Sequence, residues 1–533
     1  MSTKYVFITG GVVSSLGKGT TAASLARLLK LRGYNVAMQK MDPYYNVDPG
    51  LLSPLQHGEA FITDDGVAAD LDLGHYERLG DVRLSGLSSV TTGKIHRHMM
   101  EKERHGEYKG ATIQVIPHVT NEIKQCIRRI ADTETPDILI TEIGGTVGDM
   151  EASPYLEAIR QFKWDVGEEN CCFIHVTLLP FISAAGELKT KPTQHSVKTL
   201  RSIGIQPNII VCRTEIPISR EAKNKMALFC NVKAQNVITN MDCESLYELP
   251  MNLEKEGLAD DVLSELSLER KPADLTRWKE ITYRAMNPES HISVGMIGKY
   301  VSLRDAYLSV IESLNHAGIE RNVKVDLTLV NPESLTNDNL DEMLGGFKAV
   351  VMPGGYGKRG AEQIIMALKY AREHKIPTLM IGYGMQLGLV ELTRSLLGEK
   401  SANSREVEPD CSPVVCEVPA ERICEDAYAK PESRMGGSDI ALAPNSKIAG
   451  IYGCEKIRER HGNRYEIIEN TVKPLEKHNV LLSGRDTQTG YIEAFEVTDA
   501  PMYIGVIYHP EFLSRPDSPH PLFVELLKKA MER

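Results

Sequence analysis

A glycine-rich stretch near the start of the chain constrains its fold more than any other feature. Residues 9–21 read Thr-Gly-Gly-Val-Val-Ser-Ser-Leu-Gly-Lys-Gly-Thr-Thr, directly after the apolar run 5–8 and before a helix-favouring segment. This order predicts a strand, a tight turn and a helix start in an α/β sheet. Unpaired N–H groups at a helix start bind phosphate, and glycines let phosphate oxygens approach the backbone. We therefore predict a nucleoside triphosphate site here, in preference to an ordinary glycine turn.

Side chains of the same stretch suit this ligand. Lys18 is placed to reach the outer phosphates, and the hydroxyl of Thr20 or Thr21 is placed to approach a magnesium ion. The spacing departs from the commonest phosphate-binding loop, because Gly11 and Gly17 are one residue further apart than in that loop.

Charged side chains are expected where further strands end. A short apolar run ends at Lys40, the apolar run 137–143 carries Glu142, and Asp72 follows a long segment rich in proline, glycine and acids. Strand ends of an α/β sheet face the crevice that binds ligands, and carboxylate oxygens are preferred ligands of Mg²⁺. We place Asp72 and Glu142 at two strand ends and predict that they hold Mg²⁺ with the triphosphate. A pair of exposed acids is the alternative.

A second candidate anion site follows the apolar run 172–179. The sequence Lys189-Thr190-Lys191-Pro192 places two lysines around a threonine, a pattern that suits phosphate. A solvated loop explains these residues equally well from the local sequence alone.

Length and composition exclude several classes of protein. The chain has 533 residues, too many for one hydrophobic core, so we expect two or three domains. The net charge of -11 argues against a broad nucleic-acid or anionic membrane surface. We find no signal peptide and no apolar run long enough to span a bilayer, and expect a cytoplasmic protein. The ten cysteines lack metal-binding spacing, so we expect no zinc and no disulfide.

The alternating strand and helix patterns divide the chain into three parts. We predict a first domain at residues 1–266, a charged linker at 267–290 and a second α/β domain at 291–533. Each domain repeats short apolar runs that end in glycine or charge.

The second domain has a joint typical of α/β enzymes. The apolar run 376–381 enters Gly382-Tyr383-Gly384, and His509 precedes Glu511 near the end of the chain. A sharp strand-to-helix turn is where such enzymes hold a nucleophile, and a histidine with a following acid is the usual activating pair. The joint contains no nucleophile.

These motifs together resemble CTP synthase, a family with an amidoligase domain followed by a type 1 glutamine amidotransferase domain. The resemblance extends over essentially the whole chain. The matching stretches are residues 10–18, 41–50, 70–78, 110–120, 142–151, 189–196, 227–232 and 298–300. The resemblance implies a P-loop type parallel sheet in the first domain and the type 1 glutamine amidotransferase fold in the second.

The resemblance also implies the reaction and its residues. In this family ATP phosphorylates the 4-oxygen of UTP, and ammonia then displaces phosphate to give CTP. Lys18 and Lys40 match catalytic positions, and Asp72 and Glu142 match magnesium ligands. The ATP site matches Ser15, Leu16, Gly17, Lys18, Gly19, Thr20 and Asp72. The UTP site and the feedback CTP site match Ser14, Asp149, Met150, Glu151, Lys189, Thr190, Lys191, Pro192, Thr193, Gln194 and Lys225. Pyrimidine sites lie between subunits in this family, so a homotetramer is implied.

The second domain departs from the family's pattern at its central residue. The pattern Gly-Ile-Cys-(Leu or Tyr)-Gly-Met-Gln aligns with residues 380–386, where Gly382 replaces the cysteine and Met380 replaces the first glycine. We expect Met380 to crowd the turn. No cysteine lies between His374 and Lys400. The rest of the glutamine pocket matches Gly355, Tyr383, Gln386, Glu406 and Arg464, with His509 and Glu511 as the residual triad.

We therefore expect a ligase that makes CTP from UTP, ATP and free ammonia, with CTP as feedback inhibitor, little or no glutaminase activity and doubtful activation by GTP. One alternative is a nucleotide-binding regulatory or filament-forming subunit. This alternative predicts a damaged ligase site, whereas the charged residues of the first domain are intact in this sequence. Another is a P-loop partner ATPase, which needs no pyrimidine pocket. We expect no nucleic-acid or membrane partner.

Overall fold

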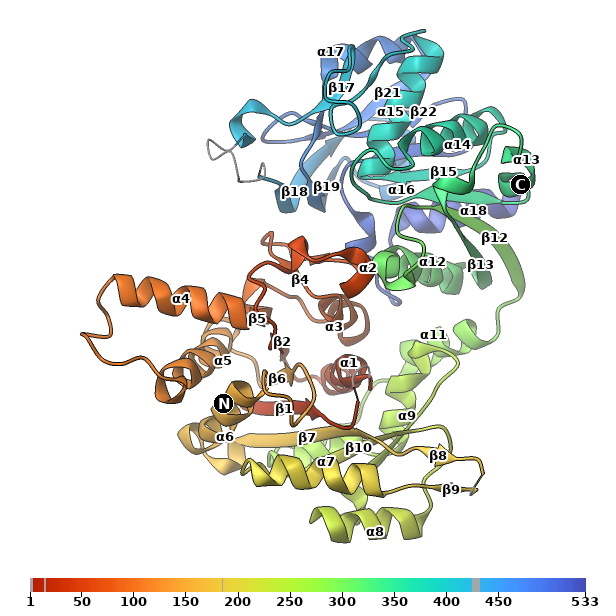
Figure 1. Cartoon of the computed structure of the whole chain (residues 1–533). Coiled ribbons are helices and arrows are strands. Elements are labelled where there is room, and N and C mark those ends of the chain that lie inside the picture. Colours follow the sequence, from red (N-terminus) through yellow and green to blue (C-terminus); the bar gives the residue numbers. More distant parts are fainter. Residues whose placement is uncertain (1–2, 14–15, 185, 424–431) are drawn as a thin grey trace. The chain divides into compact units, whose positions relative to one another are not determined.

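The computed structural model describes residues 3–13, 16–184, 186–423 and 432–533 and divides the chain into two compact units (Figure 1). The first unit comprises Met1–Leu51 and Asp72–Tyr283, and the second comprises Leu52–Leu71 and Arg284–Arg533. The sequence predicts a first domain that runs without interruption to residue 266. The structure instead groups the short segment Leu52–Leu71 with the second unit.

Seven parallel strands form the sheet of the first unit, in the order β11-β10-β7-β1-β6-β2-β5. Nearly all of their residues are buried and most are apolar, as expected for a parallel sheet covered on both faces. The strands are β1 (Lys4–Gly10), β2 (Val36–Asp42), β5 (Ser89–Thr91), β6 (Ile138–Ile143), β7 (Cys171–Leu178), β10 (Ile209–Thr214) and β11 (Val237–Met241).

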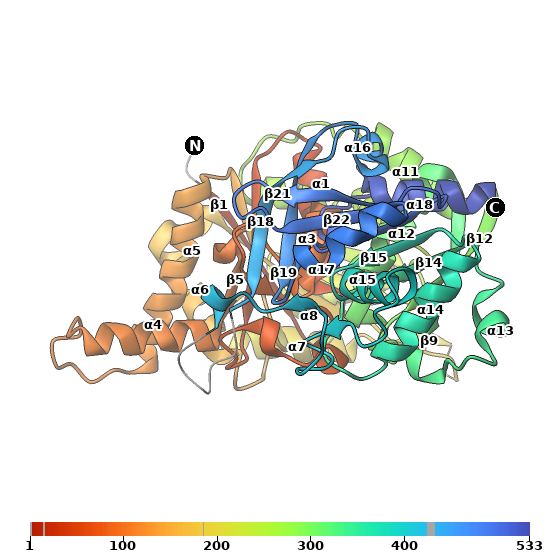
Figure 2. The same ribbon diagram turned by 90° about the horizontal axis from the view of Figure 1, so that it is seen from above.

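Helices cover both faces of this sheet (Figure 1). One group packs around α1 (Lys18–Lys30) and comprises α3 (Asp72–Gly80), α9 (Leu249–Lys255) and α10 (Leu258–Glu265). On the other side, α5 (Thr120–Glu134) packs with α6 (Ser153–Val166), and α7 (Lys191–Ser202) packs with α8 (Arg220–Cys230). Figures 1 and 2 both show α4 (Thr92–Arg104) extending away from the sheet of its unit. Helix α11 (Thr276–Met286) lies where the first unit ends.

The second unit contains a nine-stranded mixed sheet in the order β13-β12-β14-β15-β23-β22-β21-β18-β19. The first five strands are parallel and the rest are antiparallel. The parallel strands are β12 (Ser290–Ile297), β13 (Val323–Val330), β14 (Ala349–Met352), β15 (Thr378–Ile381) and β23 (Tyr503–Val506). The others are β18 (Arg434–Leu442), β19 (Lys456–Asn463), β21 (Val480–Asp486) and β22 (Ile492–Val497).

Two helical layers complete the second unit. Helices α14 (Ala361–Glu373) and α15 (Tyr383–Leu396) pack together in one apolar cluster, and α12 (Leu308–Arg321) and α18 (Pro521–Glu532) pack together in another. The segment Leu52–Leu71 adds α2 (Pro54–His57) and the hairpin β3 (Phe61–Ile62) and β4 (Ala68–Ala69). Arg460 of β19 fixes this hairpin, because its guanidinium donates to the carbonyl oxygen of Ile62 at 3.0 Å and lies over the Phe61 ring.

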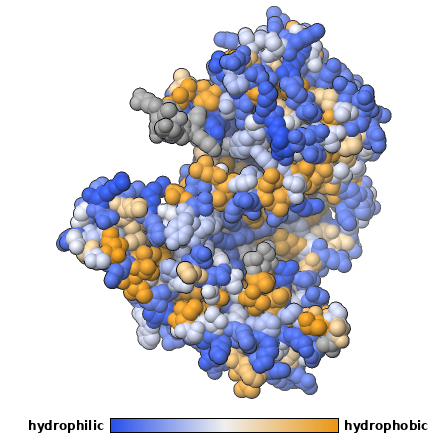
Figure 3. All heavy atoms as spheres, viewed as in Figure 1, coloured by the Kyte–Doolittle hydropathy of each residue, from blue (hydrophilic) through white to orange (hydrophobic). Residues whose placement is uncertain are grey.

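The face shown in Figure 3 is mainly hydrophilic, with apolar side chains between the hydrophilic ones. Within the described part of the chain, no helix combines the length and the apolar character needed to cross a bilayer. The nine cysteines in this part carry free thiols.

The core beneath β1 yields a stability prediction. Phe7 is fully buried, and its ring lies 5.8 Å from that of Phe162 and 5.4 Å from that of Phe173. Phe7→Ala should lower the free energy of unfolding by about 3–5 kcal/mol, because the cavity left behind cannot refill. Trp164→Ala is the control, since Trp164 is 78% exposed and should cost little. Equal urea midpoints for the two variants would contradict this account of the core.

Candidate functional site

The predicted phosphate loop has the expected geometry at its helical end. Strand β1 ends at Gly10, α1 begins at Lys18, and Gly17 between them has φ 83°. This left-handed conformation suits glycine and turns the chain into the helix. The Thr20 hydroxyl donates to the Gly17 carbonyl oxygen at 3.1 Å. Ser14 and Ser15, also predicted here, lie outside the described residues.

Lys18 crosses this loop. Its side chain lies over Gly10, where an added Cβ would be 2.5 Å from Lys18 Cδ, and its ammonium donates to the carbonyl oxygen of Gly145 at 2.9 Å. Burial lowers the Lys18 pKa, although Glu142 acts in the opposite direction. A cation held between β1 and the loop after β6 suits a phosphate that approaches the helix start.

A cluster of buried charges lies next to this loop. The Lys40 ammonium contacts the Asp72 carboxylate, lies 3.2 Å from Glu142 Oε1 and lies 3.9 Å from Asp42 Oδ1. The Tyr76 hydroxyl contacts the other oxygen of Glu142. The parallel register of β2 and β6 brings Lys40 and Glu142 into contact, because it pairs these two residues. One cation therefore lies among three carboxylates.

The pKa shifts follow from this arrangement. Burial alone would lower the Lys40 pKa, but Asp72, Glu142 and Asp42 together raise it well above its ordinary value. Burial works against ionised Asp72, yet Lys40 and His75 bring its pKa below the usual value. Burial raises the pKa of Glu142 despite the neighbouring lysines. The lysine thus stays protonated at neutral pH.

The carboxylates fit a magnesium ion. Asp72 and Glu142 approach the start of α1 from two elements, and an added Cβ on Gly19 would lie 2.7 Å from Asp72 Oδ1 and 3.4 Å from Glu142 Oε2. Hard oxygen donors beside a phosphate-binding helix start are the usual Mg²⁺ environment in nucleotide sites. The predicted strand end is correct for Glu142, which lies in β6, but not for Asp72, which is the first residue of α3. The start of a helix therefore positions this carboxylate.

The loop after β6 joins the phosphate loop to α7. The Val147 amide donates to the Gly10 carbonyl oxygen at 2.8 Å, and an added Cβ on Gly148 would lie 3.6 Å from Thr199 Cγ2. Asp149 accepts from the Thr146 amide at 3.1 Å. The loop that carries the predicted pyrimidine residues 149–151 therefore contacts the end of β1 and α7 through Val147 and Gly148.

The remaining predicted pyrimidine residues are less uniformly placed. The Lys189 ammonium pairs with Glu187, and Gln194 Nε2 donates to the Thr190 hydroxyl at 3.1 Å. Pro192 lies in the first turn of α7, and Lys191, at the start of that turn, lies 6.0 Å from the Phe229 ring. Thr193 is buried, while Glu151 and Lys225 are exposed and Met150 is 85% exposed. The predicted pyrimidine residues therefore include both exposed and buried side chains.

Gly382 occupies the strand-to-helix joint of the second unit. It separates β15 from α15, with φ 55° and ψ -111°, and its amide donates to the Val506 carbonyl oxygen at 2.8 Å. An added Cβ would lie 3.3 Å from His509 Nε2. A side chain at this position would therefore point at the imidazole.

His509 retains its orienting acid. Its Nδ1 lies 2.8 Å from Glu511 Oε1, and its ring stacks with that of Phe512. An added Cβ on Gly354 would lie 3.2 Å from His509 Cε1, which places the loop after β14 beside the imidazole. The base and its partner are assembled, but a glycine faces them.

The other predicted glutamine-pocket residues have individual contacts in the second unit. The Glu406 carboxylate accepts from the Gly357 amide at 3.0 Å, and burial raises its pKa. Gln386 is buried, and its Oε1 has no hydrogen-bond partner among the residues the structure describes. An added Cβ on Gly355 would lie 3.4 Å from the Tyr383 ring. Arg464 lies nearby in sequence to β19 and donates to the Ser433 hydroxyl at 3.3 Å.

Met380 does not crowd the joint, contrary to our expectation. It is fully buried in β15, and an added Cβ on Gly388 of α15 would lie 2.5 Å from its sulfur. The methionine therefore fills the space beneath the helix, opposite a glycine. Removing it would open a core cavity.

Sequence reasoning missed two residues of these sites. Tyr76 contacts Glu142 and lies four residues after Asp72 on the same helix, so helical spacing from the predicted ligand is the signal that finds it. Lys299 lies over the Tyr383 ring at 4.5 Å and donates to the Tyr356 carbonyl oxygen at 2.5 Å. Burial lowers the Lys299 pKa to about 8. Lys299 lies in the matching stretch 298–300, but no local sequence signal assigns it to the glutamine pocket.

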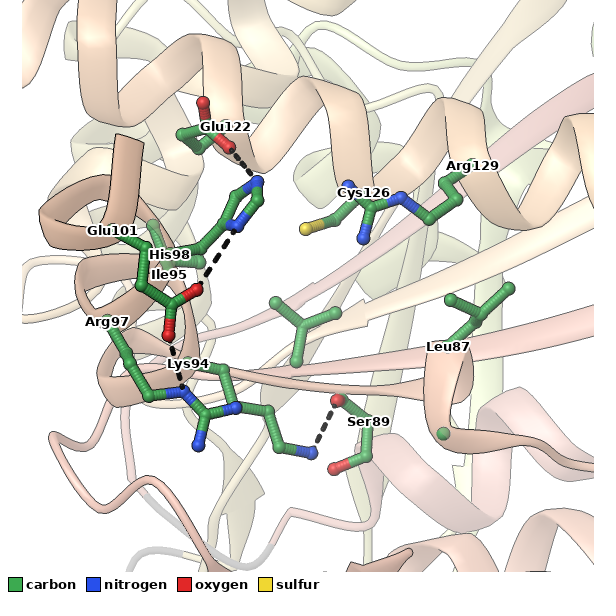
Figure 4. Close-up of a pocket in the computed structure, with 12 residues that line it drawn as sticks. Leu87, Ser89, Lys94, Ile95, Arg97, His98, Glu101, Glu122, Cys126 and Arg129 are labelled. Carbon is green, nitrogen blue, oxygen red and sulfur yellow. Dashed lines mark hydrogen bonds and ion pairs between the residues drawn. The ribbon is translucent and has the colours of Figure 1, made fainter. Parts of the chain in front are cut away.

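A separate cavity of about 230 Å³ lies between α4, α5 and residues 86–90 of the first unit (Figure 4). His98 lies between the carboxylates of Glu101 and Glu122, and Arg97 lies 3.9 Å from Glu101. None of the residues predicted for nucleotide or glutamine lines this cavity.

Comparison with known proteins gives one family match in each of the two parts of the chain. Residues 4–268 match the family described as CTP synthase N-terminus, and residues 302–529 match glutamine amidotransferase class-I. The chain is 51% identical over 532 residues to a CTP synthase of Ruminiclostridium cellulolyticum, covering 100% of this chain and 99% of that protein. It is 49% identical over 531 residues to a CTP synthase of Bacillus velezensis, covering 99% of each.

Similarity to solved structures covers part of this chain. The glutaminase domain of Trypanosoma brucei CTPS with bound acivicin covers 45% of this chain and 94% of that chain, with 27% identity and a TM-score of 0.43.

The fold and the matches define a two-part α/β ligase, in which a parallel-sheet synthase domain precedes a class-I glutamine amidotransferase domain. The chain belongs to the CTP synthase family.

The charge cluster yields a prediction that does not depend on turnover. Lys40→Met would leave Asp42, Asp72 and Glu142 facing one another without their cation, so the free energy of unfolding should fall by about 3–5 kcal/mol. Added Mg²⁺ should restore stability more in this variant than in the unaltered protein. Lys369→Met is the control, because Lys369 forms only an exposed pair with Glu373. Unfolding curves with and without Mg²⁺ provide the measurement, and an unchanged midpoint for Lys40→Met would contradict the arrangement.

Proposed function

We propose that this protein converts UTP to CTP with ATP through a 4-phosphorylated UTP intermediate, and that it uses free ammonia because Gly382 faces His509 where a nucleophile is required. The observation that supports the ligase half is the convergence of Lys18, Lys40 and the two carboxylates at one helix start. The glycine at the joint supports the ammonia half.

Each charged residue has a role in the first step. The backbone at the start of α1 and the Lys18 ammonium bind the ATP phosphates. Lys40 stabilises the charge that builds on the transferring phosphoryl group, which is the main contribution proteins make to such reactions. Asp72 and Glu142 would hold Mg²⁺, which supplies charge neutralisation on the triphosphate when bound. The protonated state of Lys40 is favoured by its carboxylates, so its charge is available at neutral pH.

The pyrimidine is proposed to bind along the loop after β6 and the start of α7. Lys189, Lys191 and Lys225 supply positive charge for a second triphosphate, and Asp149 and Glu151 supply acceptors for the sugar or base of CTP as feedback inhibitor. These residues are largely exposed in one copy of the chain. A homotetramer, in which neighbouring copies close the sites, is part of the proposal.

The loss of glutamine use follows from chemistry. Class-I amidotransferases need a thiolate to attack the amide carbonyl, with a histidine as its base. Glycine supplies no attacking atom. Water activated by His509 would leave a remnant, since related triads keep roughly 10³–10⁴-fold catalysis after loss of a member. Such a remnant is negligible beside normal glutaminase turnover.

The test of the proposal compares nitrogen sources. CTP formation from UTP, MgATP and ammonium chloride should be robust, while glutamine with or without GTP should give almost none. The purified protein must be free of other glutaminases. No CTP from either source would favour the regulatory or filament-forming subunit. Equal rates from both sources would overturn the ammonia-only assignment.

The carboxylates provide a second prediction. Asp72→Ala and Glu142→Ala should each abolish CTP formation from ammonia while circular dichroism shows an intact fold, because the metal would lose half of its protein ligands. Asp132→Ala, which removes an exposed acid of α5, should leave the rate unchanged. Near-normal turnover in either site variant would refute the proposed roles.

The joint provides a third prediction. Gly382→Cys should create glutamine-dependent CTP formation, because the unusual backbone angles of the joint are already in place and the new Cβ would lie 3.3 Å from His509 Nε2. Changing Met380 to glycine as well should reduce stability, since its buried side chain fills space against α15. Gly382→Ala is the matched control that adds a Cβ without a thiol. The result that opposes this reading is equal glutamine-dependent activity in the Cys and Ala variants.

A further inference from the structure

A chain of buried hydrogen bonds runs beneath the phosphate loop. Thr9 Oγ1 lies 2.9 Å from His175 Nδ1, and His175 Nε2 lies 2.7 Å from Ser196 Oγ. Thr9 is at the end of β1, His175 is in β7, and Ser196 is in α7. Their exposed fractions are 1%, 0% and 7%, so no water competes for these bonds.

The hydrogen bond from Thr9 to Ile174 determines which atoms donate and which accept in this series of hydrogen bonds. The Thr9 hydroxyl donates to the Ile174 carbonyl oxygen at 3.3 Å, so it accepts from His175 Nδ1–H. His175 Nε2 then accepts from the Ser196 hydroxyl. Burial, reinforced by the charge of Lys18, lowers the His175 pKa to about 3, which agrees with a neutral ring that donates on one side and accepts on the other.

The same residues contact the first part of the glycine-rich loop. An added Cβ on Gly11 would lie 1.7 Å from Ser196 Oγ and 3.0 Å from His175 Nε2. The loop backbone therefore rests directly on the His175–Ser196 hydrogen bond. Any movement of Ser196 toward β1 must displace the loop.

A second polar link holds the same two elements together. The Thr177 hydroxyl donates to Thr193 Oγ1 at 3.3 Å, and Thr193 donates to the Leu178 carbonyl oxygen at 3.0 Å. Residues 175 and 177 share one face of β7, and residues 193 and 196 share one face of α7. The start of α7 carries the residues that the proposed function assigns to UTP.

We propose that His175 is a positioning residue that ties the ATP loop to the UTP-binding start of α7 through Thr9 and Ser196. The imidazole holds β1 with one nitrogen and α7 with the other, so it sets the distance between the two nucleotide sites. Phosphoryl transfer needs its donor and acceptor aligned, and a misplacement of about 1 Å can reduce the rate on the order of 10²-fold. This inference rests on the proposed function.

Two substitutions of His175 distinguish its hydrogen bond to Thr9 from its hydrogen bond to Ser196. In His175→Asn the amide nitrogen lies near the position of Nδ1 and retains the bond to Thr9, but nothing accepts from Ser196. In His175→Gln the amide oxygen reaches the position of Nε2 and retains Ser196, but the bond to Thr9 is lost. Both replace the ring by an amide, so a merely structural role predicts similar effects. Ser196→Ala removes the α7 link while leaving the histidine in place.

The expected result is a crossover. His175→Asn and Ser196→Ala should raise the KM for UTP about tenfold, the effect of one lost buried hydrogen bond, with a smaller change in the KM for ATP. His175→Gln should show the reverse. Thr393→Ala, which removes a buried hydroxyl of α15 in the other unit, should change neither constant. The thermal unfolding temperatures of all four variants should also be measured. The difference between His175→Asn and His175→Gln should be much smaller in unfolding temperature than in the KM values.

Equal changes in both KM values for the Asn and Gln variants, or normal UTP affinity in Ser196→Ala, would overturn the positioning role. Equilibrium dialysis of UTP and of ATP is included because it needs no turnover. If the unaltered protein binds both nucleotides but makes no CTP, the proposed function fails while the crossover is still read from the dissociation constants.

Discussion

The contact of Lys40 with Asp72 and Glu142 is the interaction on which the first unit depends. It joins β2, β6 and α3 at the carboxyl ends of the strands, where a parallel sheet offers a crevice. A buried lysine is tolerated only because carboxylates surround it, and buried carboxylates are tolerated only because a cation lies among them. The proposed function assigns the same charges to phosphoryl transfer, so in that proposal one cluster serves both folding and catalysis.

The second unit contains a strand-to-helix joint with an unusual backbone geometry at Gly382. Gly382 has the unusual angles of a strand-to-helix joint, and His509 and Glu511 are in hydrogen-bond contact beside it. Glycine adopts positive φ without strain, so the joint persists at little cost. The pairing of Met380 with Gly388 shows that the core beneath the joint is well packed. The amidotransferase fold is therefore intact around Gly382.

Several features were predicted from local sequence because their physical cause is local. The order of apolar run, glycine turn and helix start predicts the geometry from β1 to α1, and the apolar run before Glu142 predicts β6. The α/β class follows from the alternation of such runs. Other features failed for equally physical reasons. Asp72 begins a helix rather than ending a strand. The grouping of Leu52–Leu71 with the second unit has no local signal, because anchors such as Arg460 are remote in sequence.

The sequence by itself determined the types of residue available: a lysine in a glycine-rich turn, carboxylates after apolar runs, and a glycine where the family's pattern has cysteine. Only the tertiary structure decided which of them meet. The register of β2 against β6 brings Lys40 to Glu142, and the packing of α7 on β7 brings Ser196 to His175. Such contacts join residues separated by tens to hundreds of positions, and no local propensity encodes them, because strand register and helix packing are set by the whole core.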